Sequence, residues 1–447
     1  MKVAFYTLGC KVNHYETQAM MALFAAAGDE LVNFDEPADV YIVNTCTVTQ
    51  VSDKKSRQAL SRAHRLRPNA AIIAVGCLGQ TGAAELRALG FVDLILGTEG
   101  RKEIVAHTRQ LVESGKWKVE SCGTFSPKTL LFKTAEQFFP SLSTFNFPLS
   151  TEFEDLSAVR DSRTRATLKI QDGCDNYCAY CVIPYARGKP RSRSVESCER
   201  ELRALADNGY REVVLTGIQL VAYGKDLPGA PDLCDIIALA ADIPGLHRVR
   251  LGSLAPQFIT ERFVNVCRAS PNLCPQFHLS LQSGCDTVLG RMNRRYATDD
   301  YRKAAERLRK AMPNCAITTD LIAGFPGETE AEHKATCAFI REMGLARVHV
   351  FPYSKRPGTA AADMPGHLPK ATKERRAREL AAIGKELEEN FVQAQLGKEV
   401  TVLIEEAGCG YTPNYVRVRV PGAAEGELVT GKLTAREGSG QTALLSS

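Results

Sequence analysis

The chain has 447 residues, a length that suggests two to four domains and several buried cores. Its formal net charge of +5 is too small to indicate nucleic-acid binding by charge alone. We expect no membrane partner, because no apolar run reaches the length of a membrane span and the first residues predict a strand rather than a signal peptide. Fifteen cysteines without a secretory signal indicate a reducing compartment, where thiols can bind metal, so we expect a cytoplasmic protein.

Residues 2–98 alternate short apolar strands with amphipathic helices, the pattern of a parallel sheet covered on both faces. We expect strands at Val3–Leu8, Val40–Asn44, Ala71–Gly76 and Val92–Leu96. We expect helices at about Tyr15–Ala27, Thr49–Leu66 and Gly82–Leu89, and a last helix at residues 99–115. The sequence therefore predicts an α/β domain over residues 1–115.

Three cysteines of this domain lie just past the carboxyl ends of predicted strands: Cys10, Cys46 and Cys77. Ligand crevices of open parallel sheets form at that edge. We therefore expect the three thiols to meet in space as one binding site. The alternative is three separate core residues, because a free cysteine packs as a small hydrophobe.

Residues 116–160 show neither helical nor alternating periodicity. We interpret them as a linker packed by the aromatic residues between Phe132 and Phe153, with one strand near Trp117–Cys122.

Strand and helix patterns alternate again over about residues 161–365. The expected strands are Thr167–Gln171, Glu212–Leu215, Arg248–Leu251, Phe277–Leu281, Ala316–Ile322 and Val348–Phe351. The expected helices include Val195–Asn208, Leu233–Ala241, Asp299–Ala311 and Glu330–Met343. Thr329 and Glu332 predict a capping box at the last helix. Six strand–helix units predict a full or partial barrel, with its chemistry at the carboxyl ends of the strands.

The loop after the first of these strands carries Cys174, Cys178 and Cys181 in the spacing Cys-x3-Cys-x2-Cys. Three thiolates can hold a cubane iron–sulfur cluster and leave its fourth iron open to a small molecule. The alternatives are a zinc site or scattered core cysteines, although structural zinc usually takes four ligands in two separated pairs.

Polar residues and glycines lie at the corresponding ends of the other strands. They are Thr216, Gly217, Ser253, Gln282, Asp320 and the turn at residues 352–354. Each of them alone can also be interpreted as a cap or turn residue.

Four cations follow the cysteine loop within seven residues: Arg187, Lys189, Arg191 and Arg193. Glycine and proline interrupt them, so they cannot form one face of an amphipathic helix. A solvated basic loop is the usual interpretation, and binding of a phosphate or carboxylate is the functional one.

A long charged helix is expected at Ala371–Gln395, after which the periodicity changes to two. Short strands are expected at Glu399–Glu405, Asn414–Val420, Gly426–Lys432 and Gln441–Leu445, a pattern typical of a small all-β barrel. Its aromatic and cationic residues are Tyr411, Tyr415, Arg417 and Arg419. Such residues stack bases and hold phosphates, although a barrel that binds no nucleic acid remains the alternative.

Together with the aromatic Tyr180 before the last cysteine of the loop, this order of parts resembles the radical S-adenosylmethionine (SAM) methylthiotransferases over essentially the whole chain. Blocks typical of that family are Arg187–Arg193, Leu215–Gly217, His278–Gly284 and Ala323–Thr329. The resemblance implies a methylthiotransferase domain at residues 1–115, a linker at 116–160, a radical SAM core at 161–382 and a TRAM domain at 383–447. The segment Arg250–Pro256 departs from the family, because it lacks the acidic residue often found near Ala255 in relatives.

The segment Thr7–Asn13 is most similar to the branch that acts on threonylcarbamoyladenosine in tRNA. Sister branches act on isopentenyladenosine in tRNA or on an aspartate of a ribosomal protein. A non-catalytic iron–sulfur protein that binds RNA or transfers electrons is the alternative from another class. The resemblance implies that one SAM supplies a methyl group to sulfur and a second supplies the radical that attacks the adenine ring. No side chain is expected to act as an acid, base or nucleophile, because the cofactor supplies this chemistry.

The family's site residues carry over to numbered positions of this chain. Cys174, Cys178 and Cys181 would hold the [4Fe–4S] cluster that cleaves SAM, and Cys10, Cys46 and Cys77 would hold an auxiliary [4Fe–4S] cluster that carries the sulfur. SAM contacts are expected from Tyr180, Thr216, Gly217, Ser253, Gln282 and Asp320. RNA contacts are expected from Arg187, Lys189, Arg191, Arg193, Tyr415, Arg417 and Arg419. The implied partners are a tRNA anticodon loop and a low-potential electron donor such as flavodoxin or ferredoxin.

Overall fold

The computed structural model describes residues 1–113, 149, 151–158, 164–437 and 442–446. The expected strand near Trp117–Cys122 and most of the expected linker lie outside these residues. The chain divides into two compact units. The first comprises Met1–Arg160, Gly173–Asp175 and Cys181–Arg191, and the second comprises Asp161–Asp172, Asn176–Tyr180 and Ser192–Ser447.

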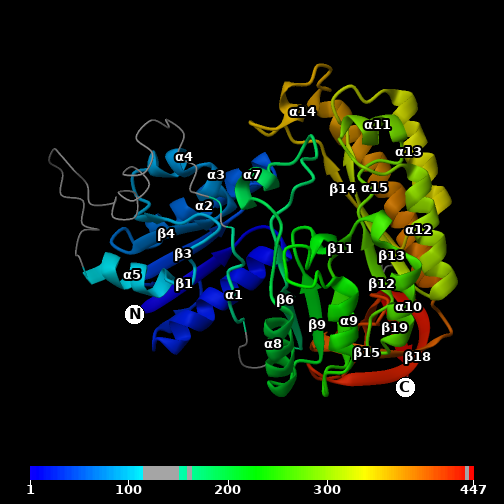
Figure 1. Cartoon of the computed structure of the whole chain (residues 1–447), viewed down its shortest axis with the longest axis horizontal. Helices are drawn as coiled ribbons and strands as arrows, with labels where there is room; N and C mark the ends of the chain where they lie inside the picture. Colours follow the sequence, from blue (N-terminus) through cyan, green and yellow to red (C-terminus); the bar gives the residue numbers. More distant parts are fainter. Residues whose placement is uncertain (114–148, 150, 159–163, 438–441, 447) are drawn as a thin grey trace. The chain divides into compact units, whose positions relative to one another are not determined.

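The first unit contains a five-stranded parallel sheet with the strand order β2-β1-β3-β4-β5 (Figure 1). Its strands are β1 (Lys2–Thr7), β2 (Glu30–Val32), β3 (Val40–Thr45), β4 (Ala71–Gly76) and β5 (Leu94–Ile95). Its helices are α1 (Lys11–Ala26), α2 (Gln50–Leu66), α3 (Cys77–Thr81), α4 (Ala83–Arg87), α5 (Ile104–Glu113) and the short α7 (Ile183–Arg187). The four predicted strands are confirmed, whereas the three-residue edge strand β2 is too short to show a period.

Strand β3 explains why this sheet lies inside the unit. All six of its residues are buried, and they point alternately to two faces. Tyr41 packs in the cluster that includes Leu60 of α2, and Ile42 packs in the cluster that includes Phe24 of α1. An uninterrupted apolar run is the pattern of a parallel strand covered on both sides.

The second unit contains the six expected core strands, arranged as two parallel sheets of order β10-β9-β6 and β11-β12-β13-β14. Their bounds are β6 (Arg165–Lys169), β9 (Glu212–Thr216), β10 (Arg248–Leu251), β11 (Ser253–Leu254), β12 (Gln276–Leu279), β13 (Ala316–Ala323) and β14 (Arg347–Pro352). The partial barrel predicted from six strand–helix units is confirmed, and the two-residue strand β11 is an addition to it.

Helices separate these strands in the expected order. They are α8 (Val195–Asp207), α9 (Leu233–Ala241), α10 (Glu261–Ala269), α11 (Asp286–Arg291), α12 (Thr298–Ala311), α13 (Glu330–Met343) and α14 (Ala360–Asp363). The remaining short elements are β7 (Gln171–Asp172), β8 (Arg191–Ser192), η1 (Leu220–Ala222) and η2 (Pro256–Phe258). The capping box at α13 is confirmed, because Thr329 Oγ1 accepts from the Glu332 N–H and Glu332 Oε2 accepts from the Thr329 N–H.

Helix α15 (Lys370–Gln393) contacts β13 and β14 and continues past residue 383, the expected start of the last domain (Figure 1). Arg376 on α15 lies 2.7 Å from the Glu328 carboxylate, and both side chains are buried. Because Glu328 also accepts from the Gly324 N–H, this pair attaches α15 to the loop after β13.

The C-terminal strands form a closed barrel of order β15-β16-β17-β19-β18. Its strands are β15 (Glu399–Glu406), β16 (Cys409–Tyr411), β17 (Arg417–Arg419), β18 (Leu428–Glu437) and β19 (Thr442–Ser446). The predicted barrel is confirmed with one strand more than expected. Strand β16 escapes prediction because it is short and contains Gly410, where a Cβ atom would lie 2.1 Å from the Leu403 carbonyl oxygen.

A buried charge network joins this barrel to the amino ends of the core strands. Glu212 accepts from Arg250 Nε at 2.8 Å, and both side chains are almost fully buried. Arg250 also donates to the Pro413 carbonyl oxygen, and Arg165 donates to the Tyr415 hydroxyl. Burial alone would raise the pKa of Glu212, but the neighbouring Arg250 guanidinium holds it below its ordinary value of 4.5.

We predict that Glu212→Gln lowers the free energy of unfolding at pH 7 by about 3–5 kcal/mol, because it leaves Arg250 buried without its counter-charge. The depressed pKa of Glu212 means that its contribution is present above pH 4.5 and is lost as the pH falls further, so the difference from wild type should shrink in acid. Urea unfolding followed by circular dichroism measures both effects. Glu261→Gln, which breaks the exposed pair with Arg307, is the matched control and should change stability by less than about 1 kcal/mol. Equal losses of stability in the two variants would contradict this role for the network.

Candidate iron–sulfur centres

The three N-terminal cysteines lie at the carboxyl ends of neighbouring strands of one sheet. Cys46 directly follows β3, Cys77 directly follows β4, and Cys10 lies three residues after β1. A Cβ atom on Gly9 would lie 3.0 Å from Cys46 Sγ, so the chain before Cys10 runs against the Cys46 side chain. Cys10 is exposed, whereas Cys46 and Cys77 are buried. The sheet therefore brings all three to one edge, as the strand pattern predicts.

Asn13 connects the ends of β1 and β3 at this edge. Its amide nitrogen donates to the Leu8 and Thr45 carbonyl oxygens, at 2.8 and 3.0 Å. Its amide oxygen accepts from Arg187 at 2.8 Å and lies 4.0 Å from Cys10 Sγ. One buried side chain thus holds two thiol-bearing loops in a fixed relation.

A buried carboxylate and two buried guanidinium groups lie behind the thiols. Glu16 pairs with Arg187 at 2.9 Å and with Arg101 at 3.1 Å, and all three side chains are fully buried. Burial raises the pKa of Cys77 to about 11 and also raises that of Cys46, while the Arg187 charge acts in the opposite direction on both. The Arg187 charge therefore favours the thiolate form that metal binding requires, while the Arg101 charge is shared between Glu16 and Glu154, which lies 2.8 Å from it.

The donor chemistry of these three thiols fits an iron–sulfur cluster. Within the described part of the chain, no group of three or more His, Cys, Asp and Glu side chains is arranged to hold a metal ion. A cubane spreads its thiolates over separate irons, so its cysteines need not converge on one point.

The second cysteine loop is held by backbone contacts on both sides of Cys178. The Ala179 N–H donates to the Met292 carbonyl oxygen at 2.9 Å, and Asn293 Nδ2 donates to the Tyr177 carbonyl oxygen at 2.9 Å. Arg294 donates directly to Cys178 Sγ at 3.1 Å. Tyr180 packs against an apolar cluster that includes Phe325. The loop thus presents a thiol that already accepts a charged hydrogen bond, which suits a thiolate ligand.

A cavity of about 330 Å³ opens beside Cys178. Its lining comes from the cysteine loop, from the segments after β9 and β10, and from the segment after α11, and includes Asn176, Gln219, Lys225, Gln257, Arg294 and Tyr296. Polar and cationic groups thus surround the approach to this thiol.

The residues expected to bind SAM lie near strand ends but do not gather in this cavity. Thr216 is buried at the end of β9, and Ser253 is exposed at the start of β11. The Gln282 N–H donates to the Asp320 carbonyl oxygen at 2.9 Å, which joins the loop after β12 to β13. The Asp320 carboxylate lies 3.3 Å from His278 Nε2. Among the described residues that line the cavity, none belongs to the expected SAM set.

Gly217 allows a close approach at the end of β9. A Cβ atom there would lie 2.9 Å from both Cβ and Oε1 of Gln171. A larger residue would push this turn away from the segment after β6.

Comparison with known proteins identifies the family. A family model described as uncharacterized protein family UPF0004 matches residues 2–97, and the radical SAM superfamily model matches residues 168–340. The threonylcarbamoyladenosine tRNA methylthiotransferase MtaB of Bacillus subtilis is 38% identical and aligns with 96% of this chain and 93% of its own. The chain belongs to the radical SAM methylthiotransferase family. It is therefore an enzyme of a class that binds a [4Fe–4S] cluster and SAM.

Other relatives cover the chain as fully. The Aquifex aeolicus protein of the same name is 35% identical over 96% of this chain and 99% of its own. The tRNA-2-methylthio-N(6)-dimethylallyladenosine synthase of Cereibacter sphaeroides is 33% identical over 97% of this chain and 96% of its own. Among solved structures, the radical SAM methyltransferase TsrM of Kitasatospora setae has a TM-score of 0.57 at 15% identity, covering 81% of this chain and 74% of that one. This last similarity shows the fold alone.

The basic segment of this methylthiotransferase differs from the solvated loop that its composition suggests. Arg187, Arg191 and Arg193 are buried. Arg187 pairs with Glu16, and Arg193 Nε donates to Ser197 Oγ at 2.9 Å. These three side chains therefore have structural partners and are not arranged to contact RNA. Lys189 is exposed and remains a predicted RNA contact.

The expected aromatic contact Tyr415 is also engaged inside the protein. Its ring stacks on Tyr411 with centroids 4.7 Å apart, and the Arg250 guanidinium lies 4.5 Å from its centre. Because its hydroxyl accepts from Arg165, this ring joins barrel and core instead of presenting a face to a base. Arg417 and Arg419 alternate with the buried Val418 and are exposed, so they remain predicted RNA contacts.

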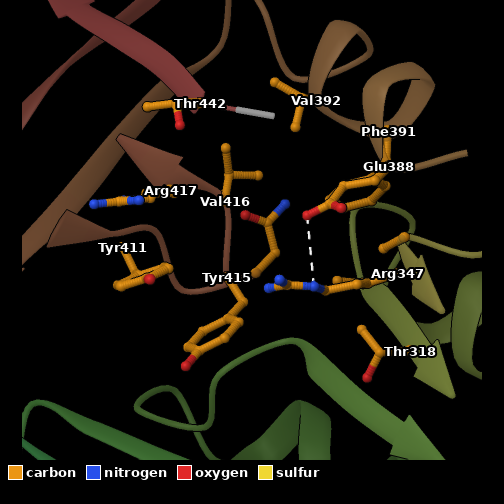
Figure 2. Close-up of a pocket in the computed structure, with 13 residues that line it drawn as sticks. Thr318, Arg347, Glu388, Phe391, Val392, Tyr411, Tyr415, Val416, Arg417 and Thr442 are labelled. Carbon is orange, nitrogen blue, oxygen red and sulfur yellow. Dashed lines mark ion pairs between the residues drawn. The ribbon is translucent and has the colours of Figure 1, made fainter. Parts of the chain in front are cut away.

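Tyr411, Tyr415 and Arg417 line a second cavity, of about 230 Å³, at the amino ends of β13 and β14. Figure 2 shows Arg347 of β14 directed at Glu388 of α15 across it, with an N···O distance of 3.6 Å. The cysteines lie outside its lining, and the parallel strands carry their chemistry at the opposite ends. This cavity is therefore separate from the one beside Cys178.

Several site residues are not predicted from the sequence. Asn13, Glu16 and Arg101 support the N-terminal thiols, and Arg294 and Tyr296 support Cys178. The signal available for the last two is a group of three arginines at the end of α11 and just after it, at positions 291, 294 and 295, followed by a tyrosine. Glu16 carries no such signal, because its partner Arg187 lies 171 residues away.

Within the described residues, no helix combines the length and the apolar character that crossing a membrane would need.

Proposed function

We propose that this enzyme adds a methylthio group to carbon 2 of threonylcarbamoyladenosine beside the anticodon of tRNA, with SAM as methyl donor and radical source. The observation that carries the proposal is the 38% identity to the Bacillus subtilis enzyme of that name across 96% of the chain. The thiols at the carboxyl ends of β1, β3 and β4 add a second site to the radical SAM loop, as two-step sulfur chemistry would require.

Two clusters are assigned to two sets of cysteines in this proposal. Cys174, Cys178 and Cys181 hold the [4Fe–4S] cluster that binds SAM. Cys10, Cys46 and Cys77 hold a second [4Fe–4S] cluster. SAM and the clusters, when bound, supply radical chemistry and sulfur that no side chain can provide.

The protein's own residues hold the thiols in place and bind SAM and the substrate base. Asn13 and the Glu16–Arg187 pair hold the N-terminal thiols in place, and Arg187 adds positive charge beside them. Thr216, Gly217, Ser253, Gln282 and Asp320, with Tyr180, are the proposed SAM contacts. The adenine lies in a single-stranded loop, where a base can leave its stack and enter a protein pocket.

The proposal also assigns a role to each domain of the chain. We assign residues 1–115 to the methylthiotransferase domain, 116–160 to the linker, 161–382 to the radical SAM core and 383–447 to the TRAM domain. The exposed cations Lys189, Arg417 and Arg419 are the proposed tRNA contacts. A low-potential donor such as flavodoxin or ferredoxin is the proposed source of electrons.

Nucleoside mass spectrometry tests the function directly. In tRNA from cells that lack the gene, we expect methylthiolated threonylcarbamoyladenosine to be absent and its unmethylthiolated precursor to accumulate. Expression of the wild-type chain should restore the product. Loss of methylthiolated isopentenyladenosine instead would favour the branch that the Cereibacter sphaeroides relative represents, and unchanged tRNA with loss of a ribosomal-protein modification would favour the aspartate branch.

We predict that substitutions in the two sets of cysteines abolish different products of the reaction. Cys178→Ala should abolish formation of 5′-deoxyadenosine under a strong reductant, because the cluster that binds SAM loses a ligand. Cys46→Ala should retain 5′-deoxyadenosine formation but yield no methylthiolated nucleoside, because only the N-terminal site is damaged. Both products are measured in the same anaerobic reaction with soluble, iron-containing protein. Full methylthiolation by Cys46→Ala would remove the N-terminal cysteines from the sulfur site.

We predict that Arg417 and Arg419 bind phosphates of the tRNA backbone. The double variant Arg417→Ala/Arg419→Ala should reduce the slope of log affinity for tRNA against log salt concentration by roughly 0.7–0.9 for each phosphate that is no longer neutralised. Lys303→Ala, an exposed cation on α12 with a side chain 65% exposed, is the control and should leave the slope unchanged. Identical slopes for wild type and the double variant would exclude these arginines from the tRNA interface.

A further inference from the structure

Arg294 is oriented toward the cysteine loop by an aromatic partner. Its Nη1 donates to Cys178 Sγ at 3.1 Å, while its Nε donates to the Tyr296 hydroxyl at 2.9 Å. The guanidinium carbon lies 4.7 Å from the centre of the Tyr296 ring, so a cation–π interaction reinforces the hydrogen bond. The planar group can therefore make both hydrogen bonds at once while it stays against the ring.

Tyr296 is itself held in place. Its side chain is buried, and its hydroxyl lies 2.6 Å from the Ser280 carbonyl oxygen and 3.0 Å from that of Leu281, just past the end of β12. The guanidinium is thus attached to the barrel framework rather than to a mobile surface chain.

The two residues before Arg294 bind the same loop as the Arg294 side chain. Met292 accepts from the Ala179 N–H and Asn293 donates to the Tyr177 carbonyl oxygen, one contact on each side of Cys178. Because three consecutive residues bind the loop, the distance between the guanidinium and the sulfur is defined by the fold.

A fixed cation at a cluster sulfur has a predictable electrostatic effect. One-electron reduction makes a cluster and its thiolates more negative, and a nearby positive charge stabilises that state more than the oxidised one. Hydrogen bonds to the sulfurs and local net charge are the factors through which proteins set these potentials. Arginine is suited to this role because its charge does not depend on pH in the accessible range.

We propose that Arg294 is a positioning residue that raises the reduction potential of the cluster held by Cys174, Cys178 and Cys181, through its charge and hydrogen bond at the Cys178 sulfur. The electron comes from the low-potential donor, and Arg294 increases the fraction of cluster that this donor can reduce. The inference rests on the proposed function only for the presence of this cluster.

The test is a redox titration of reconstituted full-length protein with dithionite, followed by electron paramagnetic resonance. The relevant signal is the one that changes when SAM is added. In Arg294→Gln, which keeps a donor but removes the charge, we expect the equilibrium constant for reduction to fall at least tenfold, a shift of about 59 mV for one electron. Arg294→Lys should recover most of this loss. Arg295→Gln, which removes the neighbouring exposed cation in the same cavity, should titrate like wild type.

Iron content is measured for every variant. A fully loaded Arg294→Gln protein with the wild-type potential would overturn the proposal, and so would an equal shift in Arg295→Gln. If Arg294→Gln cannot hold iron, Tyr296→Phe decides, because it keeps the cation but removes one of its two anchors. A smaller shift in the same direction then supports the proposal, and the wild-type potential rejects it.

These outcomes are separate from those for the function. A shifted potential in Arg294→Gln stands whatever nucleoside the enzyme modifies. A missing nucleoside product with a normal shift would reject the proposed substrate and leave the role of Arg294 intact.

Discussion

Parallel strands end at a common edge, and the thiol chemistry of this chain depends on that constraint. Cys46 and Cys77 follow β3 and β4 without an intervening residue, and the paired register of those strands determines how the two thiols are spaced. Cys10 joins them from β1, the next strand in the sheet. The radical SAM loop lies at the corresponding end of a second parallel sheet, where Cys174 follows β6 and the two-residue strand β7. One geometric rule thus accounts for both sets of cysteines.

Cations held close to the thiols are the second requirement of such sites. Glu16 is flanked by Arg101 and Arg187, and Arg101 also pairs with Glu154, so Arg187 is the cation that acts on the N-terminal thiols. Arg294 supplies a positive charge at Cys178. Thiolates and the clusters they hold are anionic, and an isolated anion in a protein interior is strongly destabilised. These arginines compensate that charge. Arg101 and Arg187 are fully buried, whereas Arg294 is partly exposed and lines the cavity beside Cys178.

The sequence predicts helices and strands that have a clear hydrophobic periodicity. It does not predict ion pairs and hydrogen bonds between residues that are distant along the chain. The strands of both sheets, the capping box of Thr329 and Glu332, and the strand-end cysteines all follow from local patterns. Strand β16 escapes prediction because Gly410 lies in a three-residue strand, where no period can be read. The basic segment has the composition of a solvated loop, and composition does not reveal a carboxylate that the fold brings to Arg187. The same limit hides Arg294, whose role depends on a sulfur 116 residues away.

The central claim is that two separate sets of three cysteines each hold one cubane cluster. Iron analysis after anaerobic reconstitution tests it most directly, with wild type compared to the triple variants Cys10→Ala/Cys46→Ala/Cys77→Ala and Cys174→Ala/Cys178→Ala/Cys181→Ala. We expect about eight irons per chain in the wild type and about four in each triple variant. A well-folded wild-type protein that saturates at about four irons, with no loss of iron in the N-terminal variant, would contradict the claim.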